Sequence, residues 1–348
     1  MELDPANGRW PPDRSAFLAD IEAKARFFED GHKAGLEAAV PGLQAAGLLF
    51  AGMGFSGVSS ELVKDACTRA MDLPFTLVKH YQFPHHVKRD WHLLAVSYSG
   101  ETEETLAVAR EARRRGVPMT AFSIGGTLAG LGGRNVPQPP GHQPRAALAY
   151  AWGSMLGFLE GSGVLHERVP VDACRRAICE VDEACGPGVP EDRNEAKRLA
   201  RKLAAKIPQI YATPAFHGVA LQFRGMLNEN AKKIAGVESI PDCNHNDLTG
   251  WGGDTENRRH FTVLILSHGD QNPEIVKRIA YMRDRYTAWD LPWHHHVFGP
   301  IDSFRDHVVE QARAIQLLDY ASFYTAMLRD QDPSEIREIK GLKAFLRA

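Results

Sequence analysis

Short apolar runs alternate with longer amphipathic stretches along much of the chain. Residues 48–52 form an apolar run ending in glycine, and helical spacing follows at about 59–70. An apolar run at 93–97 and helical spacing at 103–115 repeat the pattern, before a further run at 117–123. Because strands that alternate with helices of this length pair in parallel, we expect a parallel sheet covered by helices on both faces.

Helical patterns also flank this first unit. Apolar and charged residues interleave at helical spacing over 14–39, which predicts a helical lead-in. The segment 134–145 is rich in proline and glycine, so we expect a loop that separates the first α/β unit from an apolar helix at 146–159. Two more helices are expected near 171–183 and 193–206.

The second half of the chain resembles a diverged copy of the first. The sequence FSGV at 55–58 recurs as FHGV at 216–219, each time between a short strand and a helix. The run LLAVS at 93–97 has a counterpart in VLILS at 263–267, which helical spacing follows at 273–286. The repeat predicts a tandem pair of similar α/β domains.

We place the first domain, with its helical lead-in, at residues 1–152 and the second at 153–348. The last part of the second domain reads as a helix at 304–328, a turn at Asp332-Pro333 and a closing helix at 334–346.

The composition narrows the class of protein. Hydrophobic residues make up 44% of the 348 positions and charged residues 24%, as in a globular chain. The net charge of −2 comes without a basic block that could follow a nucleic-acid backbone or an anionic membrane. Five cysteines without a CxxC motif indicate neither a disulfide framework nor a cysteine-rich zinc site. With no signal peptide and no apolar run of about 18 residues, a cytoplasmic protein is expected.

A group of hydroxyls follows the second apolar run. Ser97, Ser99 and Thr102 lie at the expected strand end, Gly100 permits a tight turn, and a helix starts near Glu103. Free N–H groups at a helix N-terminus, together with such hydroxyls, bind a phosphate dianion without lysine or metal. The alternative is an ordinary helix cap at Thr102. Three hydroxyls at this spacing favour phosphate binding.

The glycine-rich loop after the first apolar run predicts a second part of the phosphate site. Gly54 and Ser56 lie in the sequence GMGFSG, residues 52–57. The alternative is a dinucleotide fingerprint, and Asp72 does follow Gly52 by about 20 residues, as that motif requires. Nothing else in the sequence supports a nicotinamide cofactor, so we expect no cofactor.

Together the two loops resemble the sugar isomerase (SIS) domain, which pairs a glycine-rich loop with an SxSGxTxET loop. Residues 227–232 and 241–247 further resemble the ENxAK and NHN elements of bifunctional phosphoglucose/phosphomannose isomerases. Residues 144–148 match the PRAAL element of that family, and residues 332–343 match its DPxxxxxxxxLK pattern. The motifs occur in the family's order, so the resemblance extends over essentially the whole chain.

The resemblance implies an α/β fold of two tandem SIS domains, each a flavodoxin-like sandwich, with a C-terminal helix that closes the site. It implies a metal-free isomerase that interconverts fructose 6-phosphate with glucose 6-phosphate, mannose 6-phosphate or both. The reaction would proceed by ring opening and proton transfer through a cis-enediolate. The implied catalytic unit is a homodimer, with a sugar phosphate as its ligand and neither nucleic acid nor membrane as a partner.

Four residues are the candidates for catalysis. A carboxylate with a raised pKa can both take and return a proton, which makes Glu229 the candidate base. The resemblance implies that His245 assists ring opening in the neighbouring subunit's site. Arg145 would hold the developing enediolate oxygen, since a guanidinium is a permanently charged, directional donor. Lys343 would close the site, with Lys340 one turn away as its alternative. Without the resemblance, each would read as an ordinary polar residue.

The chain departs from the family pattern in three places. Phe55 stands where the family has glycine, and we expect it to narrow the first loop; Glu335 replaces a proline before the last helix. In the second half, residues 267–271 read SHGDQ instead of a hydroxyl loop. We therefore expect only the first half to bind phosphate.

The histidine run at 294–296 suggests a metal site at first sight. Adjacent histidines in an extended segment point to opposite faces, and no carboxylate or cysteine lies at ligand spacing in the sequence. We therefore expect no metal.

Two other functions are possible for such a chain. A non-catalytic sugar-phosphate sensor is the first, although regulators of this kind usually carry a helix-turn-helix, and the acidic lead-in offers no basic recognition helix. The isomerase half of a glucosamine 6-phosphate synthase is the second. That enzyme needs an N-terminal cysteine nucleophile, whereas Cys67 already lies inside the first SIS domain. The motifs leave the preference between the two C2 epimers open.

Overall fold

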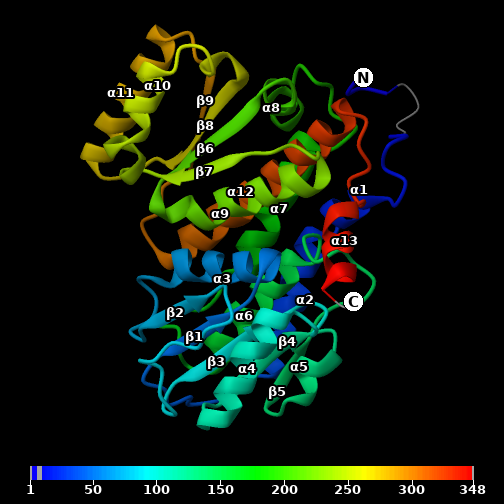
Figure 1. Cartoon of the computed structure of the whole chain (residues 1–348), viewed down its shortest axis with the longest axis vertical. Coiled ribbons are helices and arrows are strands. Elements are labelled where there is room, and N and C mark those ends of the chain that lie inside the picture. The colour runs from blue at the N-terminus through cyan, green and yellow to red at the C-terminus, as the bar shows by residue number, and fades with distance from the viewer. Residues whose placement is uncertain (1, 6–9, 347–348) are drawn as a thin grey trace.

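The computed structural model describes residues 2–5 and 10–346. Within them, two wholly parallel sheets form, one in each half of the chain (Figure 1). The first has the strand order β2-β1-β3-β4-β5, and the second the order β7-β6-β8-β9. Helices cover both sheets, which confirms the expected α/β class.

The strands are β1 Leu48–Ala51, β2 Phe75–Val78, β3 His92–Val96, β4 Met119–Ser123, β5 Arg134–Pro137, β6 Ile207–Ala212, β7 Gly236–Ser239, β8 Phe261–His268 and β9 Trp293–Phe298. The α-helices are α1 Phe17–Glu22, α2 Lys24–Glu37, α3 Gly54–Cys67, α4 Glu103–Arg115, α5 Gly126–Gly130, α6 Leu148–Gly161, α7 Val171–Cys185, α8 Glu195–Ala204, α9 His217–Asn230, α10 Asp247–Gly253, α11 Pro273–Ala288, α12 Phe304–Leu328 and α13 Arg337–Phe345. Short 3-10 helices are η1 Pro214–Phe216, η2 Asp242–His245 and η3 Arg258–His260.

The helix α4 illustrates how local sequence sets these bounds. It starts directly after Thr102, whose backbone is extended, and ends before Gly116, whose φ is 71°. Acidic residues lie in its first turn and three arginines in its last, as the helix dipole favours. The left-handed conformation at the helix end suits glycine, which has no Cβ to clash. The structure thus confirms the helix expected at 103–115.

The two halves share one hydrophobic core. The helices α3, α7, α9 and α12 lie between the two sheets in Figure 1, and α12 packs on α7, α8 and α9. One continuous cluster of buried apolar side chains extends from α2 through α12. Inside it, Lys24 forms a buried ion pair with Asp319, which also accepts from Gln222. The core therefore fixes the first half against the second.

The segment that we expect to be a linker is partly a strand. Arg134–Pro137 forms β5, which pairs in parallel with β4 at the edge of the first sheet. An edge position tolerates the proline, because a backbone N–H is not needed on the open side. The expectation of a loop over 134–145 is therefore wrong for its first four residues.

The expected division after residue 152 falls inside α6, which packs along its length against α2. A Cβ at Gly35 would lie 2.1 Å from the Ser154 carbonyl oxygen, and one at Gly157 would lie 2.1 Å from the His32 carbonyl oxygen. The glycines let the two helix backbones approach closely. Because α2 belongs to the first half, the whole of α6 stays with the first sheet.

None of the helices formed by the described residues is both long and apolar enough to span a membrane.

Candidate active site

Arg145 lies in the turn before α6 and is fully buried, at 0% exposure. Its Nη1 donates to Glu229 Oε2 at 2.8 Å and its Nε donates to Asn230 Oδ1 at 2.7 Å. Its Nη2 donates to the Pro333 carbonyl, and the guanidinium lies 5.1 Å from the centre of the Phe17 ring. A buried charge is tolerated only when it is paired and hydrogen-bonded, and these contacts meet that need. Its Nη1 also donates to Gln143 Oε1 at 3.5 Å, so these four bonds leave one of the five N–H donors of the guanidinium.

Glu229 lies in the last turn of α9, and its side chain is 23% exposed. Burial raises the pKa of Glu229 above its ordinary value, while the charges of Arg145, Lys232 and Lys343 partly oppose the rise. The next residue, Asn230, is buried, and the hydrogen bond that its Oδ1 accepts from Arg145 holds this turn beside the guanidinium. A carboxyl group held near a cation but partly desolvated can both accept and return a proton.

Lys232 was not among the expected site residues, although it is the lysine of the ENxAK element. Its Nζ donates to the Glu229 carbonyl at 2.8 Å and to the Asp332 carbonyl. Burial lowers the pKa of Lys232 to about 8. The Asp332-Pro333 turn therefore contacts both Lys232 and Arg145, and it connects the end of the chain to the Glu229 turn. Membership in a recognised motif was the only sequence signal for this lysine.

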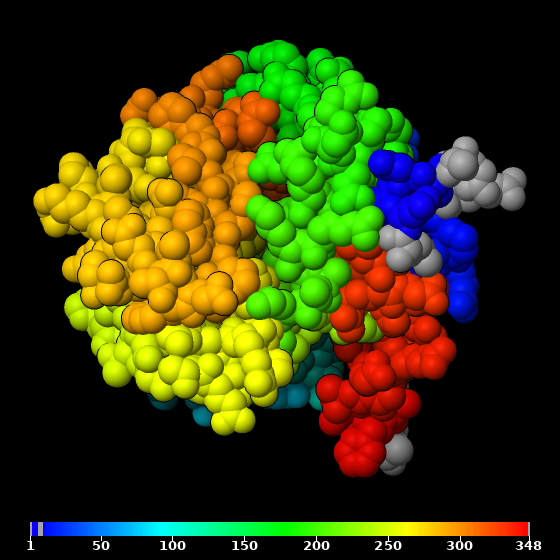
Figure 2. Space-filling view, turned by 90° about the horizontal axis from the view of Figure 1, so that it is seen from above, coloured from blue at the N-terminus to red at the C-terminus, as the bar shows by residue number. Residues whose placement is uncertain are grey.

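Lys343 lies on α13, whose residues are all exposed. Its charge lowers the pKa of Glu229, so it lies within electrostatic range of that carboxyl group. Figure 2 shows α13 standing out from the body of the molecule beside the N-terminal residues. Among the described residues, no hydrogen bond or ion pair joins Lys343 or Lys340 to Glu229. The helix is thus near the site without covering it.

His245 is the last residue of η2 and is exposed. Within the described part of the chain, no hydrogen bond or ion pair joins His245 to Glu229 or Arg145. A single chain therefore brings together Arg145 and Glu229 but not His245.

The hydroxyl loop after β3 has the compact form that its sequence predicts. Ser97 Oγ lies 2.8 Å from Thr102 Oγ1 and accepts from the Thr102 N–H at 3.4 Å. Ser99 is exposed, and its Oγ accepts from the N–H of Glu101 at 3.2 Å. Gly100 has φ 71°, and a Cβ there would lie 2.0 Å from the Gly125 carbonyl oxygen. The turn therefore requires glycine and places three hydroxyls at the N-terminus of α4.

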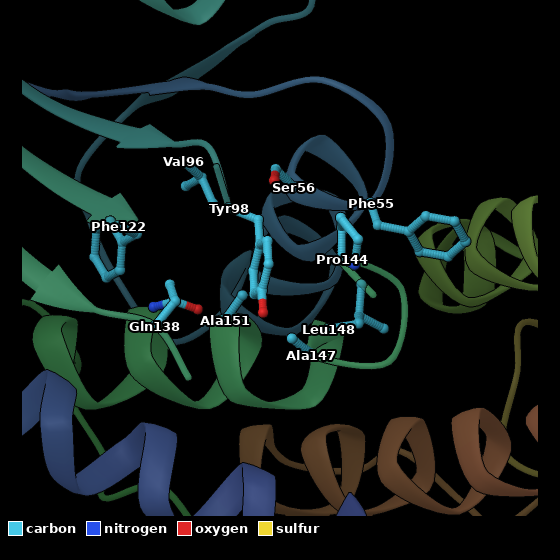
Figure 3. A pocket seen from close by; sticks show the side chains of 10 residues that line it. All are labelled: Phe55, Ser56, Val96, Tyr98, Phe122, Gln138, Pro144, Ala147, Leu148 and Ala151. Carbon is cyan, nitrogen blue, oxygen red and sulfur yellow. The ribbon is translucent and has the colours of Figure 1, made fainter. Parts of the chain in front are cut away.

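The loop after β1 lies beside it and opens α3. Gly54 is exposed with φ 51°, and Ser56 lines a cavity of about 10 Å³ that Tyr98 also lines. In Figure 3 the Tyr98 ring extends between Ser56 and α6. Its hydroxyl donates to the Pro139 carbonyl at 2.6 Å. The cavity has room for about one water.

Pro144 connects this cavity to the buried arginine, because Pro144 lines the cavity and Arg145 is the next residue. Phe55 is also among the residues that line this cavity. Its ring extends toward α9 in Figure 3, and a Cβ at Gly225 on α9 would lie 2.7 Å from that ring. Phe55 thus packs between the two halves.

The matching loops of the second half hold protein groups instead. The Gly218 N–H, at the N-terminus of α9, donates to Asp65 Oδ2 at 2.6 Å. Burial raises the pKa of Asp65 to about 7. Ser267, which matches Ser97, lies 2.7 Å from His295 Nε2 through its Oγ. Each of these two groups of the second half thus has a protein partner.

Comparisons with known proteins identify the family of this chain. The family model described as "Bacterial phospho-glucose isomerase C-terminal SIS domain" matches residues 192–346. A bifunctional phosphoglucose/phosphomannose isomerase of Pyrobaculum calidifontis is 32% identical and aligns with 67% of this chain and 70% of that relative. One of Caldicellulosiruptor bescii is 28% identical over 85% of this chain and 88% of that relative. A D-glucosamine-6-phosphate 4-epimerase of Sulfolobus acidocaldarius is 27% identical over 69% of this chain and 74% of that relative.

Solved structures show the same fold at low sequence identity. A hypothetical protein of Thermus thermophilus has a TM-score of 0.77 and 13% identity, with 99% of this chain and 94% of that chain covered. A putative phosphosugar isomerase of Clostridium difficile has a TM-score of 0.67 and 13% identity, with 94% and 97% covered.

Proposed function

Because this chain belongs to the family of bifunctional phosphoglucose/phosphomannose isomerases, we propose that it interconverts fructose 6-phosphate with glucose 6-phosphate and mannose 6-phosphate. The observation that carries the proposal is the contact of Glu229 with the buried Arg145 at 2.8 Å. This pair combines an acid–base group with a fixed positive charge, the two things that an enediolate mechanism needs.

In the proposed reaction, Glu229 removes a proton from C2 of the open-chain aldose and returns it to C1, while the hydroxyl proton on O2 passes to O1. The negative charge that develops on the substrate oxygens is stabilised by the positive charge of Arg145 and by its one N–H donor that the Glu229, Asn230, Pro333 and Gln143 bonds leave over. Arg145 does not have to move, because those bonds already fix its position. A donor fixed before the reaction costs no reorganisation during it.

The substrate phosphate would lie at the N-termini of α3 and α4. Gly54 and Ser56 would contribute from one loop, and Ser97, Ser99 and Thr102 from the other. The helix dipoles and free N–H groups favour a dianion there. Because the enclosed cavity is only about 10 Å³, Tyr98 must yield space when a sugar phosphate enters.

We further propose that the catalytic unit is a homodimer in which His245 of one copy opens the sugar ring at Glu229 of the other. Its exposure and its lack of a contact with Glu229 in one chain support this arrangement. The helix α13, which carries Lys343, exposes Leu342 and Phe345 at 58% and 78%, and a second copy would cover them. We place the enzyme in the cytoplasm, and its five free thiols support a reducing compartment.

The test measures turnover of glucose 6-phosphate and of mannose 6-phosphate by the purified chain in the presence of a chelator. Both should be converted to fructose 6-phosphate, and absence of turnover with both sugars would overturn the assignment. Turnover of only one epimer would restrict the proposal to that sugar.

A mixing experiment tests the dimer separately. His245→Ala and Glu229→Gln should each be nearly inactive alone, whereas mixed dimers should regain activity, because one of their sites contains both native residues. Light scattering should report a dimer for each variant. Failure to regain activity after subunit exchange would place both residues in the same subunit's site.

A further inference from the structure

A separate group of possible ligands lies between α8 and β9. Glu195, at the start of α8, and His294 and His296, on β9, place one ligand atom each within 4.8 Å of one another. His296 Nδ1 lies 2.8 Å from Glu195 Oε1. His294 Nε2 is buried and has no hydrogen-bond partner among the described residues. An imidazole nitrogen buried without a partner is costly and indicates a place for a ligand.

This group corrects the expectation that no carboxylate accompanies the histidine run. The alternation of side chains along the strand holds, since His295 faces away and its Nε2 lies 2.7 Å from Ser267 Oγ. The same alternation puts His294 and His296 on one face. The fold then supplies Glu195 from a helix about a hundred residues earlier in the chain, where sequence spacing gives no signal.

We propose that Glu195, His294 and His296 bind a zinc ion. Two imidazole nitrogens and one carboxylate oxygen are a set that Zn²⁺ takes in proteins, with water in the fourth tetrahedral position. Magnesium and calcium prefer oxygen ligands, and the absence of a thiolate makes the set less suited to Cu⁺.

Lys202 competes for this position. Its Nζ lies 3.2 Å from His294 Nδ1, and Lys202 itself is exposed. The ammonium group of Lys202 can donate hydrogen bonds but cannot accept them. It therefore binds the imidazole as a donor and places a positive charge where a metal ion would lie. A metal would have to displace this charge, and the exposed, flexible lysine side chain can turn into solvent. Lys202 therefore sets the affinity without being a ligand.

The ion would have a structural role. It would join α8 to β9, which is an edge strand of the second sheet, and so stabilise that sheet. The group shares no residue with the Arg145–Glu229 site, so the inference stands whether or not the proposed isomerase activity is found.

The experiment titrates the untagged, chelator-treated full chain with Co²⁺ and Zn²⁺, using Co²⁺ absorption to report tetrahedral coordination and calorimetry to report affinity. One equivalent should bind. Glu195→Gln and His294→Gln should each weaken binding by at least about tenfold, and Lys202→Met should tighten it. The matched control is His295→Gln, on the opposite face of the same strand, which should bind like the unchanged chain.

A second readout is the melting temperature. Zn²⁺ should raise it in the unchanged chain and in His295→Gln but not in His294→Gln. Circular dichroism should first show that all the variants are folded. Absence of stoichiometric Co²⁺ binding by the unchanged chain would overturn the proposal, as would an equal loss in His295→Gln and His294→Gln.

Discussion

The loops after β1 and β3 and those after β6 and β8 occupy matching places in the two halves, but their polar groups have different partners. In the first half, the hydroxyls of Ser97 and Thr102 bond to each other within one loop. In the second half, Ser267 is paired with His295, and the N-terminus of α9 is filled by the carboxylate of Asp65. The comparison shows that matching loops pair their polar groups differently, within one loop in the first half and with distant segments in the second.

The helix α9 makes the difference concrete. Its N-terminus, where a helix dipole favours an anion, is occupied by Asp65 from α3 of the first half. Its last turn instead carries Glu229, which contacts Arg145 from that same half. The second half thus uses both ends of α9 to contact the first half. One contact pairs the N-terminus of α9 with Asp65, and the other brings Glu229 to the buried Arg145.

The largest expected effect is a loss of activity when Glu229, in the last turn of α9, is changed. Glu229→Gln removes the acid–base group but keeps an oxygen that can accept from Arg145, so the fold should survive. We expect kcat to fall by about 10²- to 10⁴-fold, the usual contribution of a general base. A coupled assay measures it, and Glu238→Gln, at an exposed position on β7, is the control. A Glu229→Gln enzyme with nearly full kcat would show that the proton is carried elsewhere.

The next largest effect is on KM, and it distinguishes Ser97 in the first half from Ser267 at the matching position of the second half. Ser97→Ala should raise KM by about 10- to 100-fold, because a hydrogen bond to a charged group contributes roughly 1.5–3 kcal/mol. Ser267→Ala, the matching change in the second half, should leave KM nearly unchanged, since its partner is His295. Initial rates over a range of sugar-phosphate concentrations measure both. Equal changes in the two variants would contradict the assignment of phosphate binding to the first half.

Much of this comparison could be predicted from the sequence, and the parts that could not share a cause. Motifs placed Arg145 and Glu229 correctly in one site, because both lie in local patterns. The strand β5 was missed, since a four-residue edge strand next to prolines gives no periodic signal. Asp65 and Glu195 were missed for another reason. Each meets its partner only through the packing of distant segments, which no spacing along the chain reports.

A smaller effect concerns the pH dependence of activity. Burial raises the pKa of Glu229, so the base form is lost at a higher pH than for an ordinary glutamate. We expect kcat/KM to fall about tenfold per pH unit below that raised value and to be level above it until another group titrates. Rates measured from pH 4 to pH 8 define this limb. A limb at the ordinary glutamate value would mean that Glu229 is more solvated than the structure shows.

The smallest effect is on stability, at the other end of α9. Burial raises the pKa of Asp65 from 3.8 to about 7. Between these values the folded protein holds a proton that the unfolded chain releases, so stability falls as the pH rises through this window. Asp65→Asn removes the ionisation and keeps an oxygen for the Gly218 N–H. Its free energy of unfolding, relative to the unchanged chain, should therefore increase by about 1 kcal/mol for each pH unit within this window.

Urea unfolding at several pH values measures this, with Asp284→Asn, at an exposed position on α11, as the control. The acid limb of kcat/KM should not move in Asp65→Asn, because Asp65 contacts the N-terminus of α9 and Glu229 lies at the active site. If Asp65→Asn shifted the acid limb of kcat/KM and a change at Glu229 did not, the roles assigned to the two ends of α9 would have to be exchanged. A stability difference that did not change with pH would instead show that Asp65 is ionised throughout and acts as a fixed anion on the helix N-terminus.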